Sequence, residues 1–330
     1  MIKYVLFGKN LFQYTSFDNI RFMYSEVLDD DDIIYIPPDK TFGEKWIDFW
    51  TKKRLFRKWS SLFGIPFLKM AYKSYFKEGD KLSVEDDVIF LFLKNEPWFF
   101  GEKGFLDFLK DTFPKGKFVY KLLNLVEYIE DDIYSLKEYY DLVIACDPKD
   151  AHKYNLPLLD IGYSKVKLDN NKKPYCDCFY IGSCKNRFSP IYDVYKKLSD
   201  NGINALFYIV GVPENQIIPE KGIVYNKPLN YDEVVQFVEH TNVVMEIVQQ
   251  DQETPTLRLL ECIAYNKKLL TNNPMIINSK YYNQNCIQVF STAENINLDF
   301  FKDESINEYP NSEMISVRYM LKSIKRELTN

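Results

Sequence analysis

One pattern recurs along this chain and limits the folds that it can adopt. A short apolar run is followed by a polar loop, then by a stretch with helical spacing of apolar residues, and then by another apolar run. This alternation is typical of βα units, in which buried parallel strands are connected by helices that cover the sheet. We therefore predict an α/β fold with parallel sheets.

The apolar runs that qualify as strands fall into two sets. The first set comprises Lys3–Phe7, Ile33–Ile36, Val88–Leu93, Lys117–Leu122 and Leu142–Ala145. The second set comprises Cys178–Ile181, Ala205–Val210, Gly222–Tyr225, Val243–Val248, Lys268–Thr271 and Ile287–Val289. Each set is long enough for its own doubly wound sheet, and 330 residues suit two domains.

A polar stretch separates the two sets. Lys165–Pro174 has no hydrophobic period and ends in proline, which is typical of a linker. Asn311 and Ser312 can cap a last helix over Glu313–Leu328. We therefore predict an N-terminal Rossmann-like domain at 1–164, a linker at 165–174, a C-terminal Rossmann-like domain at 175–308 and a final helical segment at 309–330.

Charge, hydropathy and cysteine usage exclude several classes of protein. The net charge of −5 argues against nucleic-acid binding by the whole chain, and no window holds the 18 apolar residues of a membrane span. Met1–Gly8 indicates a buried strand rather than a signal peptide, so we expect a cytoplasmic protein with free thiols. Cys176, Cys178 and Cys184 lack the usual zinc spacing and a nearby fourth ligand, so we predict no metal site there.

The segment 243–271 carries the strongest chemical signal, because it reads as strand, polar loop, helix and strand. Thr254 can cap the helix, and Pro255 suits its first position. The amides of Thr256, Leu257 and Arg258 would then point out of the positive end of the helix and form an anion site. Ligands of open parallel sheets bind at the carboxyl ends of the strands, which is where this helix would begin.

Arg258 and Glu261 are the only charged residues between Leu257 and Ala264, and they share one face of the helix. Arg258 in the first turn can reach a diphosphate, and Glu261 one turn deeper can accept hydrogen bonds from ribose hydroxyls. The alternative is a salt bridge on a solvated helix face. The position of the pair after a central strand favours the ligand-binding interpretation.

Residues 252–261 and 267–273 resemble the donor-binding segment of GT-B-fold glycosyltransferases, and Glu253 and Glu261 have the E-x₇-E spacing of that segment. The sequence of this segment is most similar to that of bacterial lipopolysaccharide and capsule glycosyltransferase-like proteins. Residues 141–155 and 179–187 resemble the end of the first domain and the start of the second in the same group. The resemblance covers about residues 85–330.

The resemblance implies two Rossmann-like doubly wound domains, with a C-terminal helix that packs back on the first domain as part of a closure hinge. It also implies that the C-terminal domain binds a nucleoside diphosphate sugar and the N-terminal domain binds the acceptor. Glu261 would bind the ribose, Arg258 with the amides of Thr256 and Leu257 the diphosphate, and Glu253 or Gln252 the sugar. Gln252 is kept as the alternative because this group often has a small residue where this chain has Glu253.

A second candidate for donor binding follows the strand Cys178–Ile181. Gly182 and Ser183 allow a ligand to approach the backbone closely, and Arg187 can neutralise a β-phosphate. The alternative is an ordinary turn from strand to helix.

An inverting transfer needs a general base, and a carboxylate with a raised pKa can serve. Glu96 is the first candidate, followed by Asp147 and Glu127, although each acid could instead be a helix cap or a surface residue.

Asp29–Asp32 precede a strand and would lie at the wrong edge of the sheet, so we interpret them as a solvated turn. We predict neither a metal ion nor any cofactor beyond the donor sugar nucleotide.

The segment Lys45–Lys77 has nine basic residues against one acidic residue, with aromatic residues between them. This composition suits an anionic membrane surface that presents a lipid-linked acceptor, or else an aromatic core with a solvated basic face. Nucleic acid is the weakest interpretation.

The sequence thus predicts a metal-independent glycosyltransferase acting on a surface glycan at the inner face of the membrane. The alternatives are a non-catalytic nucleotide- or sugar-binding protein of the same fold and a nucleotide-sugar epimerase.

Overall fold

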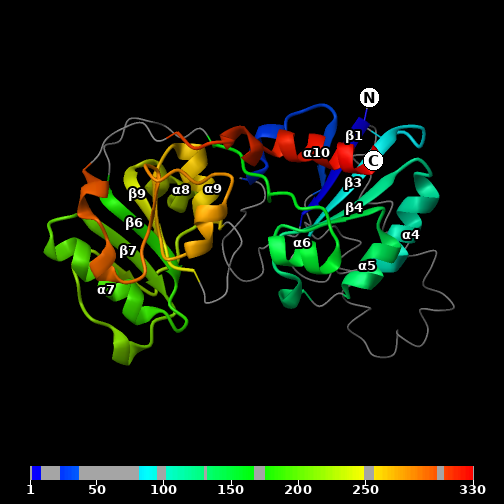
Figure 1. Ribbon diagram of the computed structural model, residues 1–330. Helices are drawn as coiled ribbons and strands as arrows, with labels where there is room; N and C mark the ends of the chain where they lie inside the picture. The colour runs from blue at the N-terminus through cyan, green and yellow to red at the C-terminus, as the bar shows by residue number, and fades with distance from the viewer. Residues whose placement is uncertain are drawn as a thin grey trace. The chain divides into compact units, whose positions relative to one another are not determined.

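The computed structural model describes residues 2–8, 23–36, 82–94, 102–129, 132–166, 175–248, 256–302 and 308–329. The chain divides into two compact units, each with a parallel sheet (Figure 1). The first unit comprises Met1–Asn10, Val27–Leu159 and Ser323–Asn330. The second unit comprises Leu11–Glu26 and Asp160–Lys322.

The sheet of the first unit has five parallel strands in the order β2-β1-β3-β4-β5. The strands are β1 (Ile2–Gly8), β2 (Ile33–Ile36), β3 (Asp87–Lys94), β4 (Lys117–Leu122) and β5 (Leu142–Ile144), and the helices are α4 (Glu102–Thr112), α5 (Ile133–Tyr139) and α6 (Pro148–Tyr154). Since β2 and β3 flank β1, the chain reverses its direction across the sheet between β1 and β3, as in doubly wound folds.

The strands of this sheet are mostly apolar because helices and loops cover them, and their charged residues include the buried Lys121 of β4. Aromatic residues fill the layer between the sheet and the helices: the rings of Phe7 and Phe92 stack with centroids 4.7 Å apart, and those of Phe90 and Phe118 stack at 5.1 Å. Leu106 and Leu109 of α4 pack into the same cluster. The aromatic-rich composition is therefore used in the core.

The sheet of the second unit has six parallel strands in the order β11-β10-β9-β6-β7-β8. The strands are β6 (Cys176–Ser183), β7 (Ala205–Val210), β8 (Ile223–Tyr225), β9 (Thr241–Glu246), β10 (Lys268–Thr271) and β11 (Ile287–Val289). The helices are α7 (Phe188–Asp200), α8 (Tyr231–Glu239), α9 (Leu257–Tyr265) and α10 (Val317–Thr329), which ends in the first unit. The chain reverses its direction across this sheet between β6 and β9.

Successive side chains of β6 pack against helices on the two opposite faces of the second sheet. Cys178 and Tyr180 pack into one cluster with Val194 of α7. Phe179 points to the other face, where its ring stacks on Phe237 of α8 with centroids 4.9 Å apart. Helices α8 and α9 thus lie on the face opposite α7 (Figure 1).

The predicted fold class is confirmed, and all the predicted strands are present, with ends that differ by up to two residues. β9 ends at Glu246 rather than Val248, because the amide of Val248 donates to the side chain of Asn272, 2.7 Å away, instead of pairing with β10. The last helix begins at Val317, since Asn311 has a left-handed backbone with a φ of 55° and Ser312–Ile315 forms a 3₁₀ turn.

We expect Gly222→Ala to destabilise the second unit by about 1–3 kcal/mol. A Cβ at this position would lie 2.2 Å from the backbone oxygen of Ala205, which cannot move without disrupting β7. Chemical denaturation followed by circular dichroism measures the change. Gly202→Asn is the control, because that site is open and asparagine tolerates its φ of 76°. Equal stability of the Gly222→Ala and Gly202→Asn variants would contradict the packing described here.

Candidate functional site

The reversal between β6 and β9 is the natural ligand position of the second sheet. The connections that leave the two parallel strands lead in opposite directions across the sheet, so the loops at their carboxyl ends separate and leave room for a ligand. Gly182 and Ser183 end β6, Glu246 ends β9, and α9 begins after the loop that follows β9. The sequence analysis assigned donor binding to two segments, and both of them lie at this same edge of the sheet.

Arg187 connects the two strands at this edge. Its guanidinium donates to the backbone carbonyl of Ile247 beyond β9 and to that of Ser183 in β6, the latter at 2.8 Å. The Nε of Arg187 is buried and has no hydrogen-bond partner among the described residues. Arg187 thus places a positive charge at the point of reversal, together with an N–H group that has no partner among the described residues.

Gly182 has a packing role of its own. A Cβ at this position would lie 2.5 Å from the hydroxyl of Tyr180, which stands two residues earlier on the same face of β6. A larger residue here would therefore have to displace the Tyr180 hydroxyl, whether or not a ligand approaches. Ser183 is exposed, and its carbonyl accepts the bond from Arg187.

Helix α9 begins later than predicted. Its N-cap is Thr256, whose backbone is extended and whose hydroxyl accepts a hydrogen bond from the amide of Arg258 at 3.1 Å. The prediction of Thr254 as the cap and Pro255 as the first helical residue is corrected, and Leu257 is the first residue of the helix. The amide of Arg258 is used by the cap, so the amide of Leu257 and the positive end of the helix remain for an anion.

Glu246 is a central residue of this edge that the sequence analysis missed. Its carboxylate accepts hydrogen bonds from the hydroxyls of Thr256 and, at 2.8 Å, Thr271. Burial raises the pKa of Glu246, although both hydroxyl groups and the charge of Arg258 oppose this rise. An acidic residue inside the apolar run 243–248 was the signal that could have identified it.

Arg258 and Glu261 form an ion pair in the protein interior. The Glu261 side chain is fully buried, and that of Arg258 is 16% exposed, so the solvated helix face considered above is not what the structure contains. The second carboxylate oxygen of Glu261 accepts a hydrogen bond from Tyr231 at 2.8 Å. Burial raises the pKa of Glu261, against the effects of Arg258 and Tyr231.

The burial of Glu261 bears on its predicted contact with ribose. Both carboxylate oxygens are engaged, and the side chain has no exposed surface. A ribose hydroxyl would reach it only after a local rearrangement, so the ribose contact stays a prediction. What the structure does show is that Glu261 fixes one side of the Arg258 guanidinium in the first turn of α9.

The first unit brings acidic residues together at the carboxyl ends of β4 and β5. Asp147 is buried and caps α6, since one of its oxygens accepts the amides of Lys149 at 2.8 Å and Asp150 at 3.1 Å. Burial, followed by the charges of Asp147 and Glu127, raises the pKa of Asp150, although its bond from the amide of Val126 lowers it. Glu127 is exposed. Asp150 was not singled out from the sequence, because it resembles an ordinary residue of a first helical turn.

Several predicted site residues lie outside the described residues, namely Glu96, Gln252, Glu253 and the whole of Lys45–Lys77. Within the described ranges there is no cluster of three or more residues suited to a metal ion. In the same ranges, no helix has the length and apolar character needed to cross a membrane. Asp29–Asp32 form turns at the amino end of β2, as the sequence predicted.

No known protein family matches this sequence, and no curated protein sequence does so either. The architecture nevertheless matches solved structures. A glycosyltransferase from Rickettsia africae ESF-5 aligns with a TM-score of 0.52 over 99% of this chain and 97% of its own, at 12% identity. A UDP-N-acetylglucosamine 2-epimerase aligns with a TM-score of 0.51 over 99% and 96%, at 11% identity. The UDP-GlcNAc 2-epimerase from Neisseria meningitidis, bound to UDP-GlcNAc, aligns with 0.50 over the full length of both chains, at 11% identity.

The fold is GT-B-like. The structural similarity to both kinds of neighbour extends over nearly all of each chain. At such low identity it concerns the fold and not the reaction. The GT-B-like arrangement places Arg187, Arg258 and the start of α9 in one C-terminal unit, around one reversal of one sheet.

We expect Glu246→Gln to raise the thermal stability relative to wild type at neutral pH and to lose this advantage as the pH falls. Because the folded-state pKa of Glu246 is raised, its contribution to stability is complete below the pKa of the unfolded chain and is lost as the pH rises through the folded pKa. The uncharged amide escapes this loss. Melting temperatures between pH 4 and 8 measure the difference, with the exposed Glu214→Gln as control. A difference that does not change with pH would contradict the assignment.

Proposed function

We propose that the protein is a glycosyltransferase that moves a sugar from a nucleoside diphosphate sugar to a cell-surface glycan, such as lipopolysaccharide, capsule or a glycoprotein glycan. The observation that carries this proposal is the convergence of Arg187, Arg258 and the start of α9 at the reversal between β6 and β9. The fold neighbours include a glycosyltransferase and an epimerase bound to UDP-GlcNAc, and these activities support a sugar nucleotide as the substrate.

The diphosphate of the donor would bind at the first turn of α9. The amide of Leu257 and the positive end of the helix favour an anion there, and Arg258 adds a full charge. Among the described residues, Arg258 donates to Glu261, and the other N–H groups of its fork would bind phosphate oxygens. Arg187 would neutralise the β-phosphate from the side of β6. Gln252 or Glu253 would bind the sugar.

The transfer step needs charge neutralisation and a base. The acceptor oxygen forms a bond to the anomeric carbon while the bond from that carbon to the phosphate oxygen breaks, and the electron pair leaves with the diphosphate. The two arginines and the helix start stabilise this developing charge without a metal ion. In an inverting reaction, the acceptor proton passes to a carboxylate of the first unit, with Glu96, Asp147 and now Asp150 as candidates.

The acceptor would be bound by the first unit, and Lys45–Lys77 would hold that unit at an anionic membrane surface on the cytoplasmic side. The support for this extension is the charge of the segment, nine basic residues against one acidic residue. Co-sedimentation with vesicles of anionic and of neutral lipid tests it.

We expect wild type to be stabilised thermally by at least one of UDP, GDP, ADP and dTDP, and Arg258→Gln to lose this stabilisation. A ligand at 100 times its Kd stabilises the native state by about 2.7 kcal/mol, which a thermal shift detects. The exposed Arg326→Gln is the control for loss of a positive charge. Arg258→Lys, which keeps the charge, should retain part of the effect and guards against a folding defect. Full stabilisation of Arg258→Gln by the nucleotide would remove Arg258 from the diphosphate site.

Epimerisation is the second candidate, because two epimerases align with the chain as well as the glycosyltransferase does. A transferase releases one nucleoside diphosphate for each sugar transferred, whereas an epimerase returns an intact nucleotide sugar with one inverted carbon. We expect nucleoside diphosphate release in the presence of EDTA, measured by NMR over a panel of nucleotide sugars with glycan acceptors. Formation of an epimer without release would favour epimerisation, and a strict requirement for a divalent ion would contradict the metal-free step.

A further inference from the structure

A buried line of polar side chains starts at Arg258 and runs through the second unit. Arg258 donates to one oxygen of Glu261, and Tyr231 at the start of α8 donates to the other at 2.8 Å. The hydroxyls of Tyr231 and Tyr163 hydrogen bond across 3.0 Å. Each tyrosine is 2% exposed, and burial raises the pKa of both, so the line is neutral except for the ion pair at its end.

The far end of this line lies where the chain passes from one unit to the other. The chain passes between the units after Asn10, Glu26, Leu159 and Lys322, and Tyr163 follows the third of these points. The backbone amide of Tyr163 donates to the carbonyl of Ile315 at 2.7 Å. Three crossing segments therefore meet close to Tyr163, all within the second unit.

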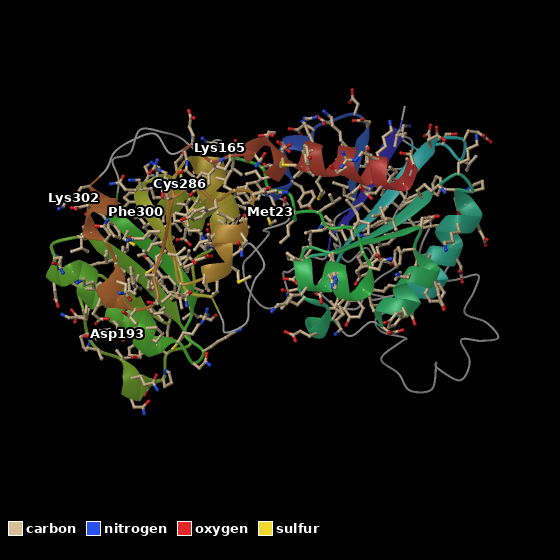
Figure 2. All side chains as sticks on the ribbon, viewed as in Figure 1. Met23, Lys165, Asp193, Cys286, Phe300 and Lys302 are labelled. Carbon is tan, nitrogen blue, oxygen red and sulfur yellow. The ribbon has the colours of Figure 1, made fainter. Side chains whose placement is uncertain are left out.

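The crossing segments are tied to one another by further hydrogen bonds. The amide of Ser164 donates to the carbonyl of Met23, and the hydroxyl of Tyr24 donates to that of Ile161, each at 2.7 Å. The amide of Arg318 donates to the carboxylate of Glu26 at 3.0 Å. Met23 and Lys165 are labelled in Figure 2 and mark two of these segments. These backbone hydrogen bonds thus restrain the segment around Tyr163, and the restrained Tyr163 hydroxyl orients Tyr231.

A guanidinium binds phosphate well only when its planar fork is aimed at the phosphate. Arg258 has a long side chain, and its partner Glu261 is the group that restrains it. Glu261 can restrain Arg258 only if its own carboxylate is fixed, and the hydrogen bond from Tyr231 does this. Without that bond a buried carboxylate oxygen lacks a donor, and the carboxylate gains freedom to reorient.

We propose that Tyr231 and Tyr163 are positioning residues for Arg258. Hydrogen bonds that begin at Tyr163, beside the crossing segments, orient Glu261, and Glu261 in turn orients the Arg258 guanidinium for a diphosphate at α9. This inference rests on the proposed function of the same site. Neither tyrosine contacts the ligand: each acts only through the next group in the line.

The test compares Tyr231→Phe and Tyr163→Phe with Tyr195→Phe, using inorganic pyrophosphate and UDP in calorimetric titrations. Tyr195 is the matched control, because it is also a buried tyrosine of the second unit whose hydroxyl makes a hydrogen bond, accepting the amide of Gly222 at 3.0 Å. We expect Tyr231→Phe to weaken binding about tenfold, the effect of one hydrogen bond to a charged group, and Tyr163→Phe to weaken it less. Tyr195→Phe should bind as wild type does.

A double-mutant cycle separates positioning from general loosening. In an Arg258→Lys background, which keeps part of the affinity but has no planar fork to be aimed, Tyr231→Phe should cause a clearly smaller loss than in wild type. An equal loss in both backgrounds, or wild-type affinity in Tyr231→Phe, would overturn the positioning role and leave the proposed function standing. Failure of wild type to bind either pyrophosphate or UDP would overturn the anion site itself, and with it both proposals.

Discussion

The carboxylate of Glu261 has no contact with solvent, and this constraint determines much of what surrounds it. A buried charge needs a counter-charge and hydrogen-bond donors, because its loss of hydration costs several kcal/mol. Arg258 supplies the charge and Tyr231 the donor. Removing one partner of such a pair costs about 3–5 kcal/mol, so the three side chains fix α9 against α8. The guanidinium is held at the first turn of α9 as a consequence.

A second buried carboxylate fixes the place where α9 begins. Glu246 accepts the hydroxyl of Thr256, which in turn accepts the amide of Arg258, while Thr271 of β10 donates to the other oxygen. The helix start is thereby attached to the ends of two strands. The arrangement has an electrostatic cost, since a carboxylate close to the first turn opposes an incoming anion. The edge is therefore preorganised by groups that need not touch a ligand.

Much of the fold could be predicted from the sequence because parallel strands covered on both faces are continuous apolar runs. Val88–Leu93 and Ala205–Val210 are such runs, and their lengths and spacing suffice to place them. The start of α9 was misplaced by two residues, because Thr254 followed by Pro255 is the stronger local cap signal, whereas the cap in the structure is Thr256, whose hydroxyl also bonds to Glu246. The acidic residue within β9 was visible, but its partners come from two separate segments, the start of α9 and β10.

The polar line through Tyr231 and Tyr163 was not predictable for a similar reason. Its members are 68 residues apart at one step and 30 at the next, and no local pattern connects a tyrosine at the start of α8 to a glutamate in α9. Arg258 and Glu261 were found because they stand three residues apart on one helix. Their burial was not, since it depends on which face of α9 meets α8.

The most direct test of the central claim is a crystal structure of the protein in complex with UDP. The account predicts a phosphate group within hydrogen-bond distance of the amide of Leu257 and of the Arg258 guanidinium, with Glu261 still bonded to Tyr231. A nucleotide bound at another edge of the second sheet, with the start of α9 free of phosphate, would contradict it.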